Sequence, residues 1–151
     1  MDNNYIFQYW EAIQDGTVTV GKWIKTIYEI LVNGLKSGKW DFDEEKANKA
    51  INFIENFCHH SEGRNDLLKL ELWQKAIVSA IFGIMDKRTG YRQFREVFIV
   101  VARKNGKTLF AAAIAAYMAY IDGEYGAKVY FLAPKLDQAD LVYDAFYQIV
   151  Q

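Results

Sequence analysis

Residues 96–108 restrict the fold of this chain more than any other stretch. Residues 97–101 are all β-branched or aromatic, which predicts a buried strand. A short polar turn follows at 103–106, and a helix is expected to begin at Lys107 or Thr108. A strand, a turn and a helix opening on Gly-Lys-Thr is the context of a phosphate-binding loop. In such a loop the N–H groups of the turn and of the new helix form a concave anion site.

The motif departs from its usual form, which is Gly, four residues and then Gly-Lys-Ser/Thr, because Val101 stands at the first glycine position. An ordinary strand-to-helix turn with a surface lysine is the alternative. That alternative does not explain why Arg103, Lys104 and Lys107 share one turn that has no acid. We therefore interpret Lys107 as the group that reaches the outer phosphates, and the Thr108 hydroxyl as a ligand of their Mg²⁺. This requires 103–106 to be a turn, and the Lys107 ammonium to face the phosphates and not bulk solvent.

The charge and the cysteine content exclude several classes of protein. The net charge of −1 gives no global basic field, so nucleic acid could be held only by a local patch. Cys58 is the single cysteine, which excludes an internal disulfide framework and suits a reducing compartment. The longest apolar run, residues 109–121, is too short to span a bilayer, and the first ten residues do not resemble a signal peptide.

The first 62 residues are predicted to form a helical N-terminal region. One helix is expected over 5–14, and a second is expected to be capped by Thr19 and stopped at Asn33-Gly34. Its apolar face would hold Val20, Trp23, Ile24, Ile27, Ile30 and Leu31. Asp41 and Glu44 resemble a capping box at the start of a third helix.

The middle of the chain holds a fourth predicted helix, with an apolar side that runs from Leu72 to Ile84, and then a basic loop. The basic cluster outside the phosphate loop consists of Lys87, Arg88, Arg92 and Arg95. We interpret it as a solvated face in preference to a DNA contact. The pair His59-His60 is interpreted as a helix end in preference to a metal site, since no second Cys/His cluster completes four ligands.

The last third of the chain is predicted to be a βαβ unit. An alanine-rich helix over 109–121 separates the strand at 97–101 from a second strand at 128–133, and a final helix begins near Leu136. The two strands should be parallel with a right-handed crossover, which makes the fold class α/β. Because two parallel strands do not complete a domain, we expect residues 63–151 to be the first part of a longer one.

With these motifs placed, the chain resembles the N-terminal part of the large terminase subunit of tailed bacteriophages, a family of DNA-packaging motors. The stretches that carry the resemblance occur in the family's order, at 43–47, 53–58 with His60, 70–74, 81–83, 102–108, 133–134 and 137–139. The stretch at 102–108, Ala-Arg-Lys-Asn-Gly-Lys-Thr, matches the family's deviant Walker A loop, in which the first glycine is missing.

The resemblance implies a RecA-like P-loop NTPase core that binds ATP and Mg²⁺. It implies that Lys107 binds the β and γ phosphates, that Thr108 binds Mg²⁺ and that Arg103 stabilises the γ-phosphate in catalysis. It also makes Gln74 an adenine-reading residue and Trp73 a wall of the base pocket, with a solvated glutamine and core packing as their alternatives. The implied nucleotide contacts are Trp73, Gln74, Ala102, Arg103, Lys104, Asn105, Gly106, Lys107 and Thr108.

The family's function implies partners and a location. These are double-stranded viral DNA, the portal protein, the small terminase subunit and a homo-oligomeric ring, in the bacterial cytoplasm at the procapsid portal and with no membrane contact. The parent protein would also carry a C-terminal nuclease. The acids after the loop do not close an apolar strand, so we expect the Walker B and nuclease carboxylates to lie outside these 151 residues and ATP turnover to be poor.

Two other functions remain open from the sequence. One is a non-catalytic interaction module, such as a truncated prophage remnant, whose helical lead-in docks to a partner. The other is a different P-loop enzyme, such as a helicase-like ATPase or a small-molecule kinase.

Overall fold

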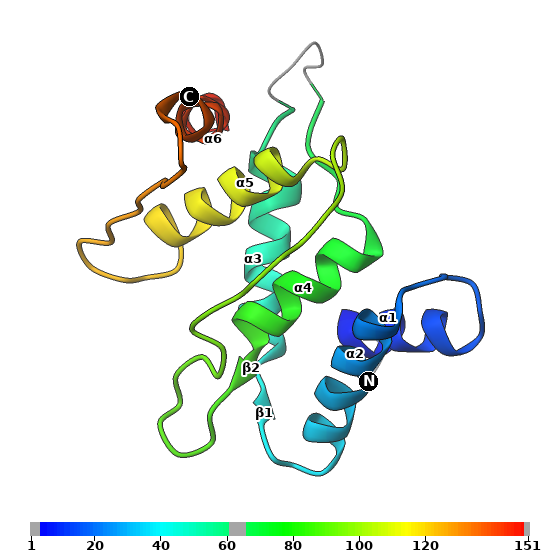
Figure 1. The fold of residues 1–151 in the computed structure, drawn as a ribbon. Helices are drawn as coiled ribbons and strands as arrows, with labels where there is room; N and C mark the ends of the chain where they lie inside the picture. The colour runs from blue at the N-terminus through cyan, green and yellow to red at the C-terminus, as the bar shows by residue number, and fades with distance from the viewer. Residues whose placement is uncertain (1–3, 61–65, 150–151) are drawn as a thin grey trace. The chain divides into compact units, whose positions relative to one another are not determined.

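The structure is a computed structural model that describes residues 4–60 and 66–149 (Figure 1). These residues form a mixture of helices and one small sheet, and they divide into two compact units that are described separately. Unit 1 consists of Met1–Ile51 and Leu70–Phe98, and unit 2 consists of Asn52–Lys69 and Ile99–Gln151. The boundary cuts helix α3 and also the segment that was predicted to be the strand before the phosphate loop.

Unit 1 is built around helix α1, Tyr5–Gln14, which packs against both α2, Lys22–Lys36, and α4, Leu72–Gly83 (Figure 1). α1 has the predicted bounds, and the Asn4 side chain caps it by accepting a hydrogen bond from the Ile6 amide at 3.0 Å. The core of the unit consists of Ile6, Tyr9, Ile13, Tyr28, Leu31, Val32, Trp40, Ala76 and Ile84. The core of unit 1 therefore combines residues of the helical N-terminal region with Ala76 of α4 and with Ile84.

Helix α2 differs from its prediction at both ends. Gly21 is its N-cap residue in place of Thr19, and the helix continues through Asn33-Gly34 to Lys36. Gly34 is needed for close packing, because a Cβ atom at this position would lie 2.4 Å from a ring carbon of Trp40. The glycine therefore marks the place where an indole ring meets the helix, and not the end of the helix.

A short antiparallel sheet connects the two parts of unit 1. Strand β1, Asp41–Phe42, pairs with strand β2, Ile84–Met85, with Asp41 opposite Met85 and Phe42 opposite Ile84. Helix α3, Glu44–Phe57, follows β1, and its cap is Asp43, whose carboxylate accepts a hydrogen bond from the Lys46 amide at 2.9 Å. The predicted capping box of Asp41 and Glu44 was therefore wrong by two residues, because Asp41 belongs to the strand.

Unit 2 consists mainly of helix α5, Lys107–Tyr120, and helix α6, Leu136–Ile149, which pack against each other (Figure 1). Four alanines of α5 are buried, as expected for a helix that lies close to its neighbours. Aromatic rings complete the packing, with Tyr120 stacked on Phe146 at 6.2 Å and Tyr117 against Phe53 of α3 at 5.8 Å between ring centroids. The predicted helix starts at Lys107 and near Leu136 are confirmed.

The parallel βαβ unit is the main correction to the sequence analysis. Residues 97–101 and 128–133 do not form strands, and the only sheet among the described residues is the antiparallel pair β1–β2. The segments are also not buried, since 93% of Phe98 and 92% of Leu132 are accessible to solvent. β-propensity reflects packing against neighbouring strands. Within residues 4–60 and 66–149, neither segment has a strand beside it to pair with.

Candidate functional site

The start of α5 provides a set of backbone donors. Gly106 is the N-cap residue, and its carbonyl accepts the hydrogen bond of the Phe110 amide at 2.9 Å. Helix geometry leaves the three preceding amides, at Lys107, Thr108 and Leu109, without carbonyl partners inside the helix. No side chain caps this end of the helix. The three N–H groups and the positive end of the helix dipole therefore suit an anion.

The turn before the helix has a left-handed backbone at two positions. The φ angle of Lys104 is 66° and that of Gly106 is 64°, and Lys104 is the only non-glycine with positive φ among the described residues. Left-handed residues that alternate with others turn successive N–H groups toward one side and make a concave anion site. A lysine in this conformation stores about 1–2 kcal/mol of backbone strain. Strained backbone of this kind is concentrated at functional sites in proteins.

Asn105 holds the turn together from within. Its side-chain amide donates to the carbonyl oxygens of Ala102 at 3.2 Å and of Arg103 at 3.4 Å. These bonds engage two carbonyl groups that would repel a phosphate if they faced it. Asn105 was predicted from the sequence only as a nucleotide contact, and this bracing role was not predicted. The dipeptide Asn105-Gly106, a strong turn signal, could have indicated it.

The loop is open to solvent and positively charged. Residues 102–107 are exposed, and Arg103, Lys104 and Lys107 form no ion pair with a described residue. The first requirement of the phosphate-loop interpretation is met, because 103–106 are turn and bend residues and not helix. The second is not met in this structure, since Lys107 is exposed to bulk solvent, so the interpretation now requires that side chain to turn toward the phosphates when they bind. The loop thus has backbone donors and cations that are exposed to solvent.

Thr108 is the first partly covered residue of the loop, one position into α5. Its hydroxyl is a hard oxygen ligand of the kind that Mg²⁺ accepts beside phosphate oxygens and water. The described residues contain no group of three or more His, Cys, Asp or Glu side chains that could hold a metal ion by themselves. The residues present therefore fit a Mg²⁺ ion that arrives with a phosphate ligand.

Trp73 and Gln74, the predicted base contacts, lie in unit 1 on the first turn of α4. The Gln74 side-chain oxygen accepts a hydrogen bond from the Glu71 amide at 2.9 Å and forms a capping box with Glu71. Only 8% of Gln74 is accessible, so the alternative of a solvated glutamine was wrong. Trp73 is partly buried against the core of unit 1. Both side chains thus have structural roles in their own unit.

Comparison with known proteins was made for the whole chain. A family model described as "Terminase large subunit, ATPase domain" matches residues 72–151, which begin with α4 and include the loop at 102–108. No curated protein and no solved structure matches the chain. In the described part of the chain, no helix is both long enough and apolar enough to cross a membrane.

Proposed function

The chain belongs to the terminase large subunit family, of which it carries the ATPase domain over residues 72–151, and on this basis we propose that the loop at 102–108 binds ATP. The observation that carries the proposal is the pair of left-handed residues, Lys104 and Gly106, that leads into a helix end without a side-chain cap. This backbone directs donors toward an anion before any ligand arrives, which lowers the cost of ordering the site.

The residues of the loop would divide the work on the phosphates. The amides at 107–109 and the turn N–H groups would bind phosphate oxygens, and Lys107 would swing from solvent to the β and γ phosphates. The Thr108 hydroxyl would hold Mg²⁺, which supplies charge neutralisation when it is bound with ATP. Arg103 would place a positive charge beside the transferred group and oppose the negative charge that develops there.

Recognition of the base is proposed for Gln74 and Trp73. The oxygen of Gln74 is engaged by the Glu71 amide, so the NH₂ group of its side chain is the part available to a base. A donor alone can pair with N7 of either purine, which predicts weak discrimination between ATP and GTP. Trp73 would contribute apolar surface from the rim of the unit 1 core.

The role in the cell is proposed from the family as a whole. ATP hydrolysis would drive double-stranded viral DNA into a procapsid through its portal, in the cytoplasm of the bacterial host. The proposed partners are the portal protein, the small terminase subunit and further copies of the motor in a ring. A nuclease activity would belong to the same packaging cycle.

The experiment that tests the proposal is an ATP titration of the 151-residue protein with the variant Lys107→Ala. A matched control is Lys128→Ala, which removes another exposed lysine of unit 2 that lies outside the loop. We expect ATP binding that is lost with Lys107→Ala and kept with Lys128→Ala. Equal loss in the two variants, or no binding by the unchanged protein at millimolar ATP, would refute a phosphate site at the loop.

Slow turnover of ATP is proposed for these 151 residues. Among the described residues, the acids that follow the loop, such as Asp122 and Asp137, do not follow a strand, which is where the carboxylate pair that holds Mg²⁺ and activates water would be expected. A steady-state assay should therefore show binding with little hydrolysis. Hydrolysis at the rate of an ordinary motor protein, abolished by Lys107→Ala, would contradict this.

A non-catalytic docking role for the helical region is the second candidate, because α2 exposes part of its predicted apolar face. Trp23 is 78% accessible, and Ile24, Ile27 and Ile30, which were predicted to share its apolar face, are also exposed. A stripe of this size on a surface helix is typical of a contact with another protein. This function would be favoured if ATP binding were absent while Ile27→Asp abolished binding to a packaging partner.

A further inference from the structure

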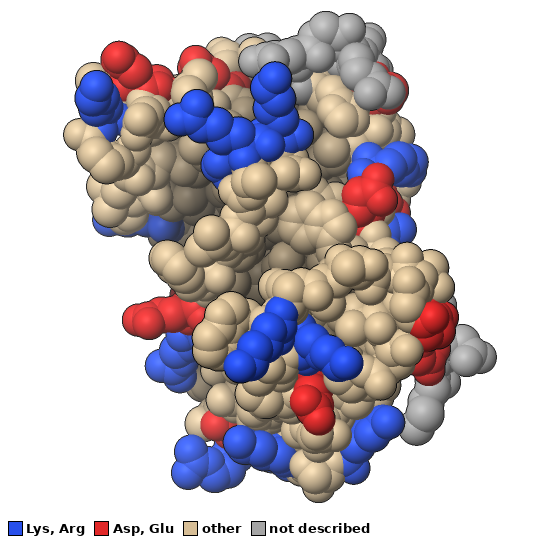
Figure 2. Space-filling model, turned by 45° about the vertical axis from the view of Figure 1, so that its right-hand side comes forward, with Lys and Arg blue, Asp and Glu red and all other residues tan. Residues whose placement is uncertain are grey.

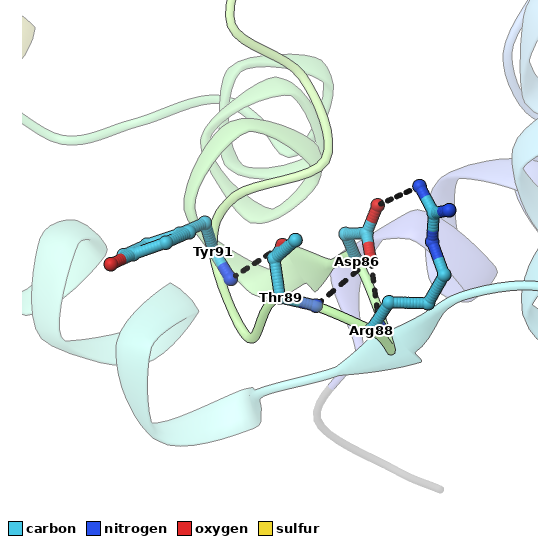
Figure 3. A network of polar contacts seen from close by, with 4 residues as sticks. All are labelled: Asp86, Arg88, Thr89 and Tyr91. Carbon is cyan, nitrogen blue, oxygen red and sulfur yellow. Dashed lines mark hydrogen bonds and ion pairs between the residues drawn. The ribbon is translucent and has the colours of Figure 1, made fainter.

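Residues 84–93 of unit 1 form a hairpin, and polar contacts among Asp86, Arg88, Thr89 and Tyr91 lie at its tip (Figure 3). The Gln93 amide donates to the Ile84 carbonyl at 2.9 Å, and Met85 and Arg92 form an antiparallel bridge. At the tip, the Asp86 amide donates to the Tyr91 carbonyl at 2.9 Å. The backbone ladder of β2 is therefore extended beyond the sheet into an exposed loop.

The carboxylate of Asp86 organises this tip. One of its oxygens accepts hydrogen bonds from the amides of Arg88 at 2.7 Å and Thr89 at 3.1 Å, and the Thr89 hydroxyl accepts from the Tyr91 amide at 3.3 Å (Figure 3). The backbone hydrogen bonds to its oxygens lower the pKa of Asp86 below its usual value. The Asp86 carboxylate thus binds the backbone of the loop, and these hydrogen bonds brace the tip.

Two basic side chains of the hairpin, Lys87 and Arg88, are exposed, whereas the Arg92 guanidinium lies 5.4 Å from the ring centroid of the buried Phe82. The Arg88 side chain is 88% exposed, and its only ion pair in the described structure is a long one of 3.8 Å with Asp86. Lys87 is exposed and lies 3.5 Å from Asp41, while Tyr91 is 67% accessible. Exposed ion pairs of this kind contribute less than about 1 kcal/mol, so they can be exchanged for a stronger anion.

The fold brings a further lysine, distant in the sequence, to the same place. A Cβ atom on Gly38 would lie 3.3 Å from the Lys87 ammonium, so the turn before β1 lies beside the hairpin. Lys39 follows in that turn, with its ammonium 4.9 Å from the ring centroid of Trp40. The Trp40 ring in turn contacts Phe94, next to the base of the hairpin. Figure 2 shows that lysine and arginine side chains gather in groups on the visible face of the molecule.

The charge along the chain is strongly uneven. Residues 86–108 hold seven Lys or Arg and two acids, a net of +5, which leaves −6 for the remainder of a chain whose total is −1. Three of the seven are the loop cations already assigned to ATP. The other four are Lys87, Arg88, Arg92 and Arg95, in and directly after the hairpin. The acidic remainder of the chain repels polyanions. A polyanion would therefore bind at the local basic segment.

We propose that the 84–93 hairpin, with Lys39 beside it, contacts the sugar–phosphate backbone of double-stranded DNA. The choice of duplex DNA as the polyanion rests on the proposed packaging function. Exposed Arg and Lys on a rigid loop fit contacts to phosphates, which position a protein without reading sequence. Asp41 and Asp43 lie near the base of the hairpin, where they pair with Lys87 and Lys46. Their negative charge would repel phosphates, so the contact is limited to the outer side of the hairpin.

The test is the salt dependence of duplex DNA binding by the full 151-residue chain. The variant is the double change Lys87→Gln and Arg88→Gln, and the matched control is Lys22→Gln with Lys25→Gln, two exposed lysines of α2 in the same unit. Loss of two phosphate contacts reduces the magnitude of the slope of log K against log salt by about 1.8. The affinity for DNA at 0.1 M salt should then fall by up to about 60-fold. The control should keep the slope and the affinity of the unchanged protein.

Three results would overturn the proposal: no DNA binding by the unchanged protein, equal slopes for all three proteins, or the same loss in the variant and in the control. Competition by polyglutamate as effective as competition by DNA would also overturn it, since the site would then take acidic protein. Thermal melting of each variant excludes a folding defect. An ATP titration of the same variants separates this proposal from the nucleotide site, because the hairpin changes should leave ATP affinity unchanged while Lys107→Ala leaves the DNA slope unchanged.

Discussion

Replacing Lys104 with glycine should stabilise the protein, although it removes a side chain from the candidate nucleotide site. The φ angle of 66° costs a residue with a Cβ atom about 1–2 kcal/mol, and glycine adopts this conformation without that cost. Glycine loses about 0.5–1 kcal/mol more backbone entropy on folding. The difference is a net gain of about 0.5–1 kcal/mol, which raises the melting temperature of a 150-residue protein by about 1–4 °C.

Two companion variants test whether backbone strain is the cause, by the direction in which each changes the melting temperature. Lys104→Ala removes the same charge but keeps the strained backbone, so its melting temperature should stay close to that of the unchanged protein. Gly106→Ala should lower the melting temperature by a similar 1–4 °C, because φ is 64° there and no atom within 4 Å would meet the new Cβ. The effect of Gly106→Ala would therefore come from the backbone alone.

Calorimetry and ATP titration together make the assay. If Lys104 acts on ATP only through its charge, Lys104→Gly and Lys104→Ala should weaken ATP binding equally while they differ in stability. Gly106→Ala should weaken both, since it disturbs the left-handed cap that directs the amides of α5. A fall in the melting temperature with Lys104→Gly, or no change with Gly106→Ala, would refute the view that the turn stores backbone strain at these two positions.

Three further predictions concern residues outside the loop. Gln74→Ala should destabilise the ATP-free protein by about 1 kcal/mol through loss of its bond to the Glu71 amide, and Gln74→Glu, which keeps an acceptor, should restore most of it in urea unfolding. Gly34→Ala should destabilise by about 1–3 kcal/mol because the new Cβ meets the Trp40 ring, whereas an unobstructed helix position would gain about 1 kcal/mol; a rise in stability would show that the indole can move away. Burial raises the pKa of the Cys58 thiol to about 12, so iodoacetamide at pH 8 should label it only when the protein is unfolded, and labelling of the folded protein at the rate of a free thiol would contradict its burial.

Sequence alone located the helices well because their information is local. The periodicity of α1 and the Gly-Lys-Thr start of α5 depend on a few adjacent residues, and the structure has both where they were predicted. The errors arise where a distant group decides. Gly34 looked like a helix stop because its partner, the Trp40 ring, cannot be seen in a helical pattern. Gln74 looked solvated because a capping role depends on the backbone of Glu71 and not on the helix face.

The segments at 97–101 and 128–133 show the strongest form of this limit. Their composition is that of buried strands, but a parallel strand is stabilised by hydrogen bonds to neighbours and by cover on both faces. The described residues give them neither, and Phe98 and Leu132 remain almost fully accessible. The sequence could therefore indicate what these segments prefer, and it could not indicate that the chain leaves the preference unsatisfied.

This unsatisfied preference bears on the phosphate loop, because residues 97–101 lead into it with only Ala102 between. Fixing the backbone of one residue costs about 1–2 kcal/mol of conformational entropy. If ATP binding orders the unpaired segment at 97–101 together with the loop, this entropy cost amounts to several kcal/mol and weakens binding. Any polypeptide that pairs with 97–101 would take over part of that cost and tighten ATP binding. By thermodynamic reciprocity, ATP would then favour the pairing by the same factor. The preformed turn at Lys104 and Gly106 reduces this cost. The coupling between ATP binding and strand pairing would act through the exposed segment at 97–101.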